Sequence, residues 1–230
     1  MSTYPFIAIE GQDGVGKTTL RKSLFQLLGN AYDRIPLSVL TVNYVDYRVA
    51  RALIEGKYSP SPENRDAYLD AIIADKRASL DRLVRPALAD RPVLADRWLL
   101  SEMVFCYVRH AMELADTYTR VAPHLELAAD VTLLLELDAE SSHRRAGQRS
   151  GEATRPDWDI PDVQERVRVA YRNAAEHASE FPLLGVVRSI ESDQPREAVL
   201  RAAWKALADA EVVPRRRTDS SHALGGVYDC

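Results

Sequence analysis

The 230-residue sequence has little cysteine, no long apolar run and no excess of basic residues. Its two cysteines, Cys106 and Cys230, offer neither a disulfide framework nor the paired spacing of a zinc site. No apolar run approaches the roughly 20 residues that span a bilayer, and the first residues lack a signal-peptide pattern. The formal net charge of −4 argues against a protein that coats nucleic acid, because such proteins present a strongly basic face. We therefore expect a cytoplasmic protein without a membrane or a nucleic-acid polymer as partner.

The apolar fraction of 46% is enough for one core of generous size, so we expect residues 1–213 to form a single domain. Residues 214–230 lack periodicity, and we expect them to form a disordered tail. Histidine offers no metal site, because none of the five has the spacing of a ligand pair.

A glycine-rich segment near the start carries the strongest motif. Residues 11–18, GQDGVGKT, fit the G-x-x-x-x-G-K-[ST] pattern of the phosphate-binding loop, or P-loop. A strand-like run at 6–9 precedes it, and apolar residues at helical spacing follow it. Glycines permit the positive φ angles needed to wrap a triphosphate, and the helix start adds N–H donors. We expect Lys17 to contact the phosphates of ATP and Thr18 to bind Mg²⁺. The predicted ATP-binding residues of this segment are Gly11, Gly14, Val15, Gly16, Lys17, Thr18 and Thr19.

Strand-like and helix-like segments alternate along the chain, which predicts a three-layer α/β fold with a mostly parallel five-stranded sheet. Ligands bind such sheets at the carboxyl ends of the strands, where Asp13, Asp96 and Asp138 fall. Asp96 is the expected partner of Mg²⁺ through water, with a helix cap as the alternative role. After the first strand, we expect strands at 36–44, 91–97, 131–138 and 186–190, and helices at 47–56, 63–88, 99–115, 162–180 and 195–210.

The sequence resembles the thymidylate kinase family of nucleoside monophosphate kinases. The opening FIAIEGQDGVGKTT is close to the family's F-I-x-x-E-G-x-D-G-x-G-K-T-T, and ADRWLLS at 95–101 is similar to its D-R-Y-x-x-S. RPAL at 85–88 is common in relatives, and VTLLLELDAE followed by three basic residues resembles the strand before an arginine-bearing lid. The resemblance implies a P-loop kinase fold with a lid at about 142–159, ATP and Mg²⁺ as cofactors, nucleotide substrates and a homodimer.

The resemblance also implies roles for several residues. Arg97 would clamp the acceptor phosphate with two hydrogen bonds, or else form a structural salt bridge. Asp13 would lie near the acceptor sugar, or simply form a turn. Because Gly14 occupies the position where some relatives have a catalytic arginine, the lid must supply that charge, unless its arginines are only solvated. The expected lid residues are Arg144 at ATP and Arg145 and Arg149 in catalysis.

The acceptor side departs from the family pattern. Ala-Asp-Lys-Arg at 74–77 replaces A-D-R, and Val-Phe-Cys at 104–106 replaces A-Y-Q, so two polar groups are missing. Losing a polar base contact changes specificity strongly. We therefore expect ATP-dependent phosphorylation of a dTMP-like or modified pyrimidine monophosphate to the diphosphate. One alternative is a kinase acting on a nucleoside hydroxyl, with Asp46 as base; another is a nucleotide-binding switch without turnover. The expected acceptor-binding residues are Asp13, Arg51, Lys76, Arg77, Arg97 and Phe105.

Overall fold

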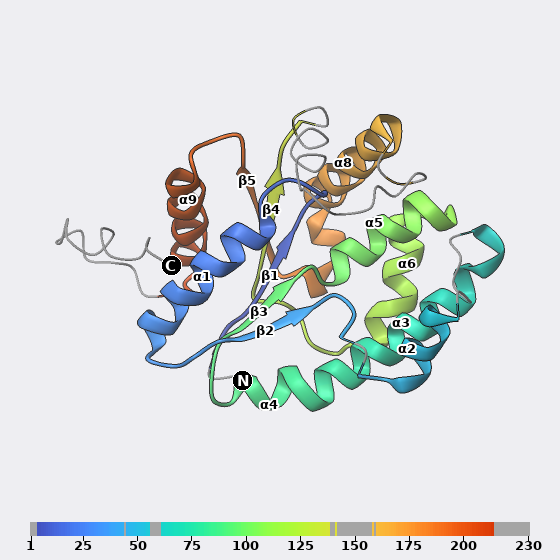
Figure 1. Ribbon diagram of the computed structural model, residues 1–230, viewed down its shortest axis with the longest axis horizontal. Helices are drawn as coiled ribbons and strands as arrows, with labels where there is room; N and C mark the ends of the chain where they lie inside the picture. Colours follow the sequence, from blue (N-terminus) through green and yellow to red (C-terminus); the bar gives the residue numbers. More distant parts are fainter. Residues whose placement is uncertain are drawn as a thin grey trace.

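The computed structural model describes residues 4–43, 45–55, 61–138, 141, 158 and 160–213. Within them, five parallel strands form one sheet in the order β2-β3-β1-β4-β5 (Figure 1). The predicted α/β class and five-stranded sheet are confirmed, whereas nearly all of the expected lid and the tail at 214–230 lie outside the described residues. The strands are β1 (Phe6–Glu10), β2 (Leu37–Leu40), β3 (Val93–Asp96), β4 (Val131–Glu136) and β5 (Val186–Glu191).

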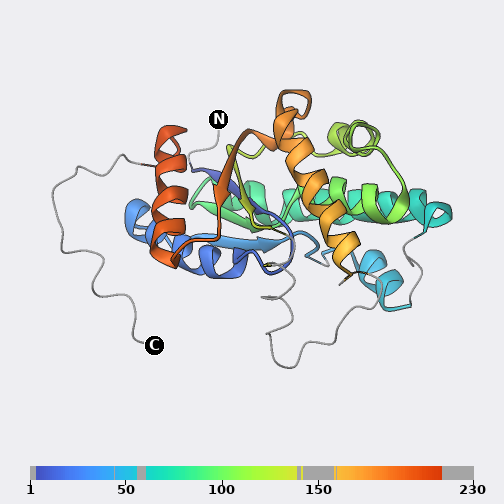
Figure 2. The same ribbon diagram turned by 90° about the horizontal axis from the view of Figure 1, so that it is seen from above.

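Helices cover both faces of the sheet and make three layers (Figure 2). Along β1, Ile7 and Ile9 join the core under α1 and α9, whereas Phe6 and Ala8 join the core on the opposite face. A strand buried on both faces explains the nearly continuous apolar sequence of β1 and β4. The helices are α1 (Lys17–Tyr32), α2 (Tyr47–Ile54), α3 (Arg65–Ser79), α4 (Arg85–Leu88), α5 (Leu99–His110), α6 (Leu114–Val121), α8 (Pro161–Glu176) and α9 (Arg196–Asp209).

The helical segments follow the predicted pattern, apart from ends that shift by up to four residues and two larger differences. The long helix expected at 63–88 is α3 and α4 joined by a π-helical turn, Leu80–Val84. The turn lies just before Pro86, which cannot donate an N–H to the preceding turn. The helix expected at 99–115 instead ends at His110, because Ala111 adopts a left-handed conformation with φ 50°. α6 then begins at Leu114, a helix that the apolar periodicity did not separate from α5.

β2 is shorter than the sequence predicts, and the reason lies in the next layer. The strand expected at 36–44 ends at Leu40, whose N–H donates to Asn43 Oδ1 at 2.9 Å. The carboxylate of Asp75 on α3 accepts the N–H of Asn43 at 2.9 Å and that of Val45 at 2.8 Å. These backbone groups therefore bind a buried side chain and not a neighbouring strand.

No helix in the described part of the chain is long and apolar enough to cross a membrane.

Candidate active site

The P-loop connects β1 to α1 and adopts the backbone that its glycines predict. Gly11, Gly14 and Gly16 have φ angles of 133°, 80° and 94°. A Cβ added at Gly11 would lie 2.5 Å from the carbonyl oxygen of Leu135, so the loop packs directly against β4. Val15 is buried beneath the loop, whereas Thr18 and Thr19 are exposed on the first turn of α1. The exposed helix start leaves N–H groups available for an anion.

Lys17 is buried under the P-loop. Its Nζ donates to the carbonyl oxygens of Gly11 at 2.9 Å and Gln12 at 2.5 Å. Burial, followed by the nearby positive charge of Arg97, lowers the pKa of Lys17 to about 7. Among the described residues, no carboxylate forms an ion pair with Lys17. A buried ammonium held by neutral carbonyl groups would gain strongly from an anion placed beside the loop.

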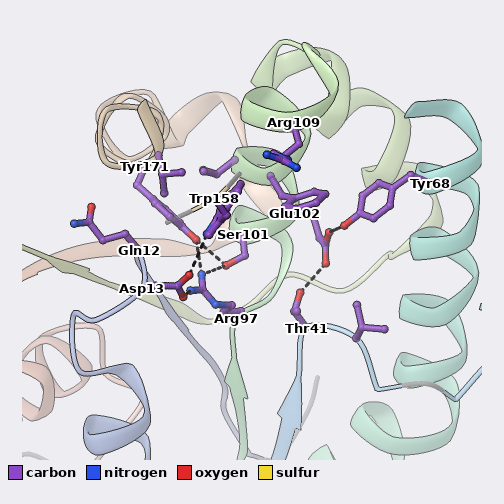
Figure 3. A pocket seen from close by; sticks show the side chains of 14 residues that line it. Gln12, Asp13, Thr41, Tyr68, Arg97, Ser101, Glu102, Arg109, Trp158 and Tyr171 are labelled. Atoms are coloured by element: carbon purple, nitrogen blue, oxygen red, sulfur yellow. Dashed lines mark hydrogen bonds and ion pairs between the residues drawn. The ribbon is translucent and has the colours of Figure 1, made fainter. Parts of the chain in front are cut away.

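Arg97 connects the P-loop to the helices on the other face of the sheet (Figure 3). Its Nη1 donates to Gly11 O at 2.8 Å, Ser101 Oγ at 3.1 Å and Tyr171 OH at 2.9 Å. Its Nη2 forms an ion pair with Asp13 at 2.5 Å. Arg97 itself has φ 70°, an uncommon conformation for a residue with a Cβ. The strained backbone and the four partners hold the guanidinium against the loop.

Glu10, the last residue of β1, fixes where α5 begins. Its buried carboxylate accepts the N–H of Trp98 at 2.8 Å, the N–H of Ser101 at 3.2 Å and the Ser101 hydroxyl. Burial raises the pKa of Glu10 above its usual value, although the hydrogen bond from Ser101 opposes that shift. The sequence analysis assigned Glu10 no role, but its position in the E-G-x-D-G-x-G-K pattern was the available signal.

Asp96 ends β3 next to Arg97 and forms an ion pair with α1. Arg21 Nε lies 3.1 Å from Asp96 Oδ2, and Arg21 Nη1 donates to Ser38 Oγ at 2.9 Å. Asp138, the third carboxylate expected at this edge, accepts the N–H of Ser141 at 2.8 Å. β1 and β3 pair in parallel with Ile9 opposite Asp96, so the carboxyl ends of these two strands lie side by side.

A cavity of about 630 Å³ opens between the P-loop, β2 and α5. One face of α5 lines it with Ser101, Phe105 and Arg109, which follow Arg97 at intervals of four residues and thus share one side of the helix. The Phe105 ring lies 5.1 Å from that of Tyr68 and 5.6 Å from that of Trp158, measured between centroids. Of the residues in this paragraph, the sequence predicted only Arg97 and Phe105 at the acceptor side. The four-residue spacing was the available signal for Ser101 and Arg109.

Two further lining residues, Tyr171 and Trp158, come from distant parts of the chain and were not among the predicted site residues. Tyr171 on α8 shares hydrogen bonds with Arg97 and with Ser101 Oγ, the latter at 2.8 Å. Burial raises the pKa of Tyr171, so its hydroxyl stays protonated. Trp158 donates from Nε1 to Asp13 Oδ2 at 3.1 Å. The expected lid residues Arg144, Arg145 and Arg149 lie outside the described residues.

Thr41, Glu102 and Tyr68 lie at one side of the cavity (Figure 3). Together with Lys76 behind them they form a cluster of polar contacts, which we call the polar wall. Glu102 accepts the Thr41 hydroxyl and the Tyr68 hydroxyl, each at 2.7 Å. Lys76 is completely buried; its Nζ donates to Thr41 O at 2.9 Å and lies 3.4 Å from Glu102 Oε1. The ammonium also lies 4.4 Å from the centroid of the Trp98 ring. Lys76, predicted to touch the acceptor, thus supports the wall from behind.

Three residues singled out from the sequence lie away from this cavity. Arg77 is exposed and borders a separate depression of about 170 Å³ beside α4. Arg51 is exposed on α2 and pairs with Glu55 at 2.6 Å. Asp46, the base of the hydroxyl-kinase alternative, accepts the N–H of Arg48 at 2.8 Å at the start of α2. Hydrogen bonds from the Arg48 side chain and backbone lower the pKa of Asp46 to about 2, so it is a weak base.

A second cavity of about 390 Å³ lies on the other side of the P-loop. Gly14, Gly16 and Thr19 border it together with Gln194, which lies between β5 and α9, and Arg196, the first residue of α9. Because Gln12 and Asp13 border the first cavity, the P-loop separates two spaces of nucleotide size. The loop can therefore present its N–H groups at the junction of two ligands.

Comparison with known proteins agrees with this arrangement. A family model described as Thymidylate kinase matches residues 9–192. A thymidylate kinase of Xanthomonas campestris is 30% identical over 218 residues, covering 94% of this chain and 88% of the relative. One of Desulfovibrio desulfuricans is 28% identical and covers 92% of this chain and 97% of its own. The crystal structure of thymidylate kinase from Ehrlichia chaffeensis has a similar fold, with a TM-score of 0.67 at 16% identity over 89% of this chain and 98% of that chain.

Proposed function

The chain belongs to the thymidylate kinase family and is a nucleotide kinase. We propose that it transfers the γ-phosphoryl group of ATP to a dTMP-like or modified pyrimidine nucleoside monophosphate, giving the diphosphate. The observation that carries the proposal is the contact between Arg97 and the P-loop. Arg97 Nη1 donates to Gly11 O at 2.8 Å while the same side chain lines the first cavity. A phosphate gripped by Arg97 is thereby directed at the phosphates held by the loop.

The residues around the P-loop fit ATP and Mg²⁺. Positive φ angles at its three glycines and the buried ammonium of Lys17 suit a wrapped triphosphate. Thr18 and Asp96 would hold the metal together with phosphate oxygens and water, as is typical of Mg²⁺. No group of three or more metal-ligating His, Cys, Asp or Glu occurs among the described residues, which is consistent with such a sparse site. When bound, ATP supplies the phosphoryl group and Mg²⁺ neutralises part of its charge.

The chain's own contribution is positioning and charge neutralisation. Lys17 would move from the loop carbonyls to the β- and γ-phosphates and regain a stable positive charge. Arg97 would orient the acceptor phosphate so that one of its oxygens bonds to the γ-phosphorus as the bond to the ADP oxygen breaks. Asp13, Ser101 and Tyr171 hold the guanidinium of Arg97 in place for that approach. We also keep Arg145 and Arg149 as proposed catalytic residues, and Arg144 as a proposed ATP contact.

A turnover assay with ATP, Mg²⁺ and a panel of nucleoside monophosphates and nucleosides tests the proposal. We expect a monophosphate to be the acceptor, Lys17→Ala to abolish both ATP binding and transfer, and Arg97→Ala to remove transfer while ATP still binds. Arg91→Ala is a matched control, because Arg91 is partly exposed, borders neither cavity and pairs with Asp90 at 2.7 Å. Transfer to a nucleoside hydroxyl alone would overturn the proposal, and ATP binding without any transfer would favour a switch.

A homodimer and a cytoplasmic location stay proposals that rest on the family resemblance. Light scattering coupled to size-exclusion chromatography would measure the mass in solution, and a monomer at assay concentrations would contradict the first. Fractionation of the source cells would test the second.

A further inference from the structure

The polar wall, as far as the described residues form it, is rich in hydrogen-bond acceptors. Lys76 has three N–H groups, and its Nζ has three oxygen neighbours in the wall: Thr41 O at 2.9 Å, Thr41 Oγ1 at 3.3 Å and Glu102 Oε1 at 3.4 Å. The hydroxyl protons of Thr41 and Tyr68 point to the Glu102 carboxylate, which can only accept. Lys76 is not among the residues that line the cavity, and the two hydroxyl groups that do line it have an acceptor on Glu102. The Glu102 carboxylate and the Thr41 hydroxyl oxygen, both of which line the cavity, therefore make this side of it rich in acceptors.

Burial keeps this pattern of donors and acceptors in place. Glu102 is 3% exposed and Lys76 is 0% exposed, so water does not replace one of these partners easily. Burial and the charge of Glu102 raise the pKa of Tyr68 well above its usual value, which keeps its proton on the phenol. Arg109 also lines the cavity, but it lies seven residues beyond Glu102, about 10 Å further along α5. It is therefore not part of this wall.

The rest of the cavity suggests how an acceptor nucleotide lies. Figure 3 shows Arg97 with Asp13 and Tyr171 on one side, and Glu102 with Thr41 and Tyr68 on the other. Given the proposed function, the acceptor phosphate lies at Arg97, so the base extends toward the polar wall. Phe105 and Trp158 offer flat surfaces against which a base can stack.

We infer that the acceptor base is a 4-aminopyrimidine of the cytosine type, and that Glu102 selects it over 4-oxopyrimidines such as thymine and uracil. The 4-amino group brings two N–H donors to a wall of acceptors, whereas O4 of thymine or uracil is itself an acceptor. A 4-oxopyrimidine offers one N–H, at N3, between two carbonyl groups that would face the lone pairs of the wall. Such mismatches leave buried polar groups unpaired, which is the strongest basis for rejecting an analogue. The inference rests on the proposed function, and it specifies the substrate class of that site.

Two matched pairs of acceptors isolate position 4 of the base. dCMP and dUMP differ at that position and in the N3 proton that accompanies it, and so do 5-methyl-dCMP and dTMP. With ATP and Mg²⁺, we expect kcat/KM to be higher for the amino member of each pair by about 10² or more. This ratio is smaller than the roughly 10⁴ to 10⁵ by which a site can reject an analogue that lacks a hydrogen-bonding group, because N3–H of the oxo member restores part of the lost hydrogen bonding. A ratio under about 10 in both pairs, or a preference for dTMP over 5-methyl-dCMP, would overturn the inference.

Glu102→Gln tests the residue itself. The amide keeps the shape of the side chain but adds N–H donors, so we expect the amino-to-oxo ratio to fall by about 10-fold or more. Glu113→Gln makes the same chemical change at an exposed position and should leave the ratio unchanged. Tyr68→Phe keeps the carboxylate and removes one internal donor, so the amino preference should persist. An unchanged ratio in a folded Glu102→Gln protein, checked by its melting temperature, would refute the role of Glu102.

Binding measurements separate this inference from the proposed function. If dTMP is phosphorylated and 5-methyl-dCMP is not, the kinase assignment stands and the base assignment is wrong. If no monophosphate is phosphorylated, the proposed function fails, and calorimetric titration of the four nucleotides still decides the base preference. Tighter binding of the 4-oxo members, or no binding of any of the four, would then overturn the inference.

Discussion

Lys17 gives the sharpest prediction because its charge depends on whether phosphates are bound. Burial lowers the pKa of Lys17 to about 7, with Nζ held by carbonyl oxygens of Gly11 and Gln12. Bound phosphates favour the charged form, so ATP binding should raise the pKa and take up a proton. At about pH 8 the free side chain is roughly one-tenth protonated, so binding should take up about 0.9 proton per ATP.

The same shift sets the pH dependence of affinity. ATP must bind the charged form, so the dissociation constant scales as one plus the ratio of neutral to charged Lys17. It should therefore rise about eightfold from about pH 7.5 to about pH 8.5. Calorimetry in two buffers of different ionisation enthalpy measures the proton uptake directly. Lys17→Arg is the control, because a guanidinium stays charged throughout this range and its affinity should vary little.

A flat dissociation constant over this pH range, together with no proton uptake by the wild-type protein, would refute the reasoning. It would mean that Lys17 is already fully charged before ATP binds, and that burial does not control its ionisation.

Two further predictions concern the packing that supports the loop. Gly11→Ala should abolish ATP binding and lower the free energy of unfolding by at least about 2 kcal/mol, because its φ is 133° and the new Cβ would lie 2.5 Å from Leu135 O. In Gly29→Ala, the new Cβ in α1 would make only ordinary contacts, so urea unfolding should show no loss of stability or a gain of up to about 1 kcal/mol. Similar losses of stability in Gly11→Ala and Gly29→Ala would contradict the strain assigned to Gly11. Tyr171→Phe removes an acceptor from Arg97, so kcat/KM for the monophosphate should fall about tenfold with ATP binding unchanged, and full activity would count against a positioning role.

Much of the fold could be predicted from local pattern. Alternating strand-like and helix-like segments gave the parallel α/β sheet, and β4 and α9 lie where periodicity placed them. The P-loop was equally local, since three glycines and a lysine within residues 11–17 specify an unusual backbone. One error came where a distant group competes for the backbone: Asp75 ends β2 early by binding N–H groups that the β-branched sequence would have given to a strand.

The sequence by itself determined the phosphate loop, the strand ends that carry Asp96 and Arg97, and hence the class of chemistry. Only the tertiary structure decided which side chains meet the acceptor. Lys76 and Arg77 are neighbours in the chain, but successive residues of a helix point about 100° apart, so one is buried against Glu102 and the other faces away from the cavity. The donor and acceptor pattern of the polar wall likewise arises from three separate segments brought together by packing. It exists only when those helix faces and the end of β2 meet.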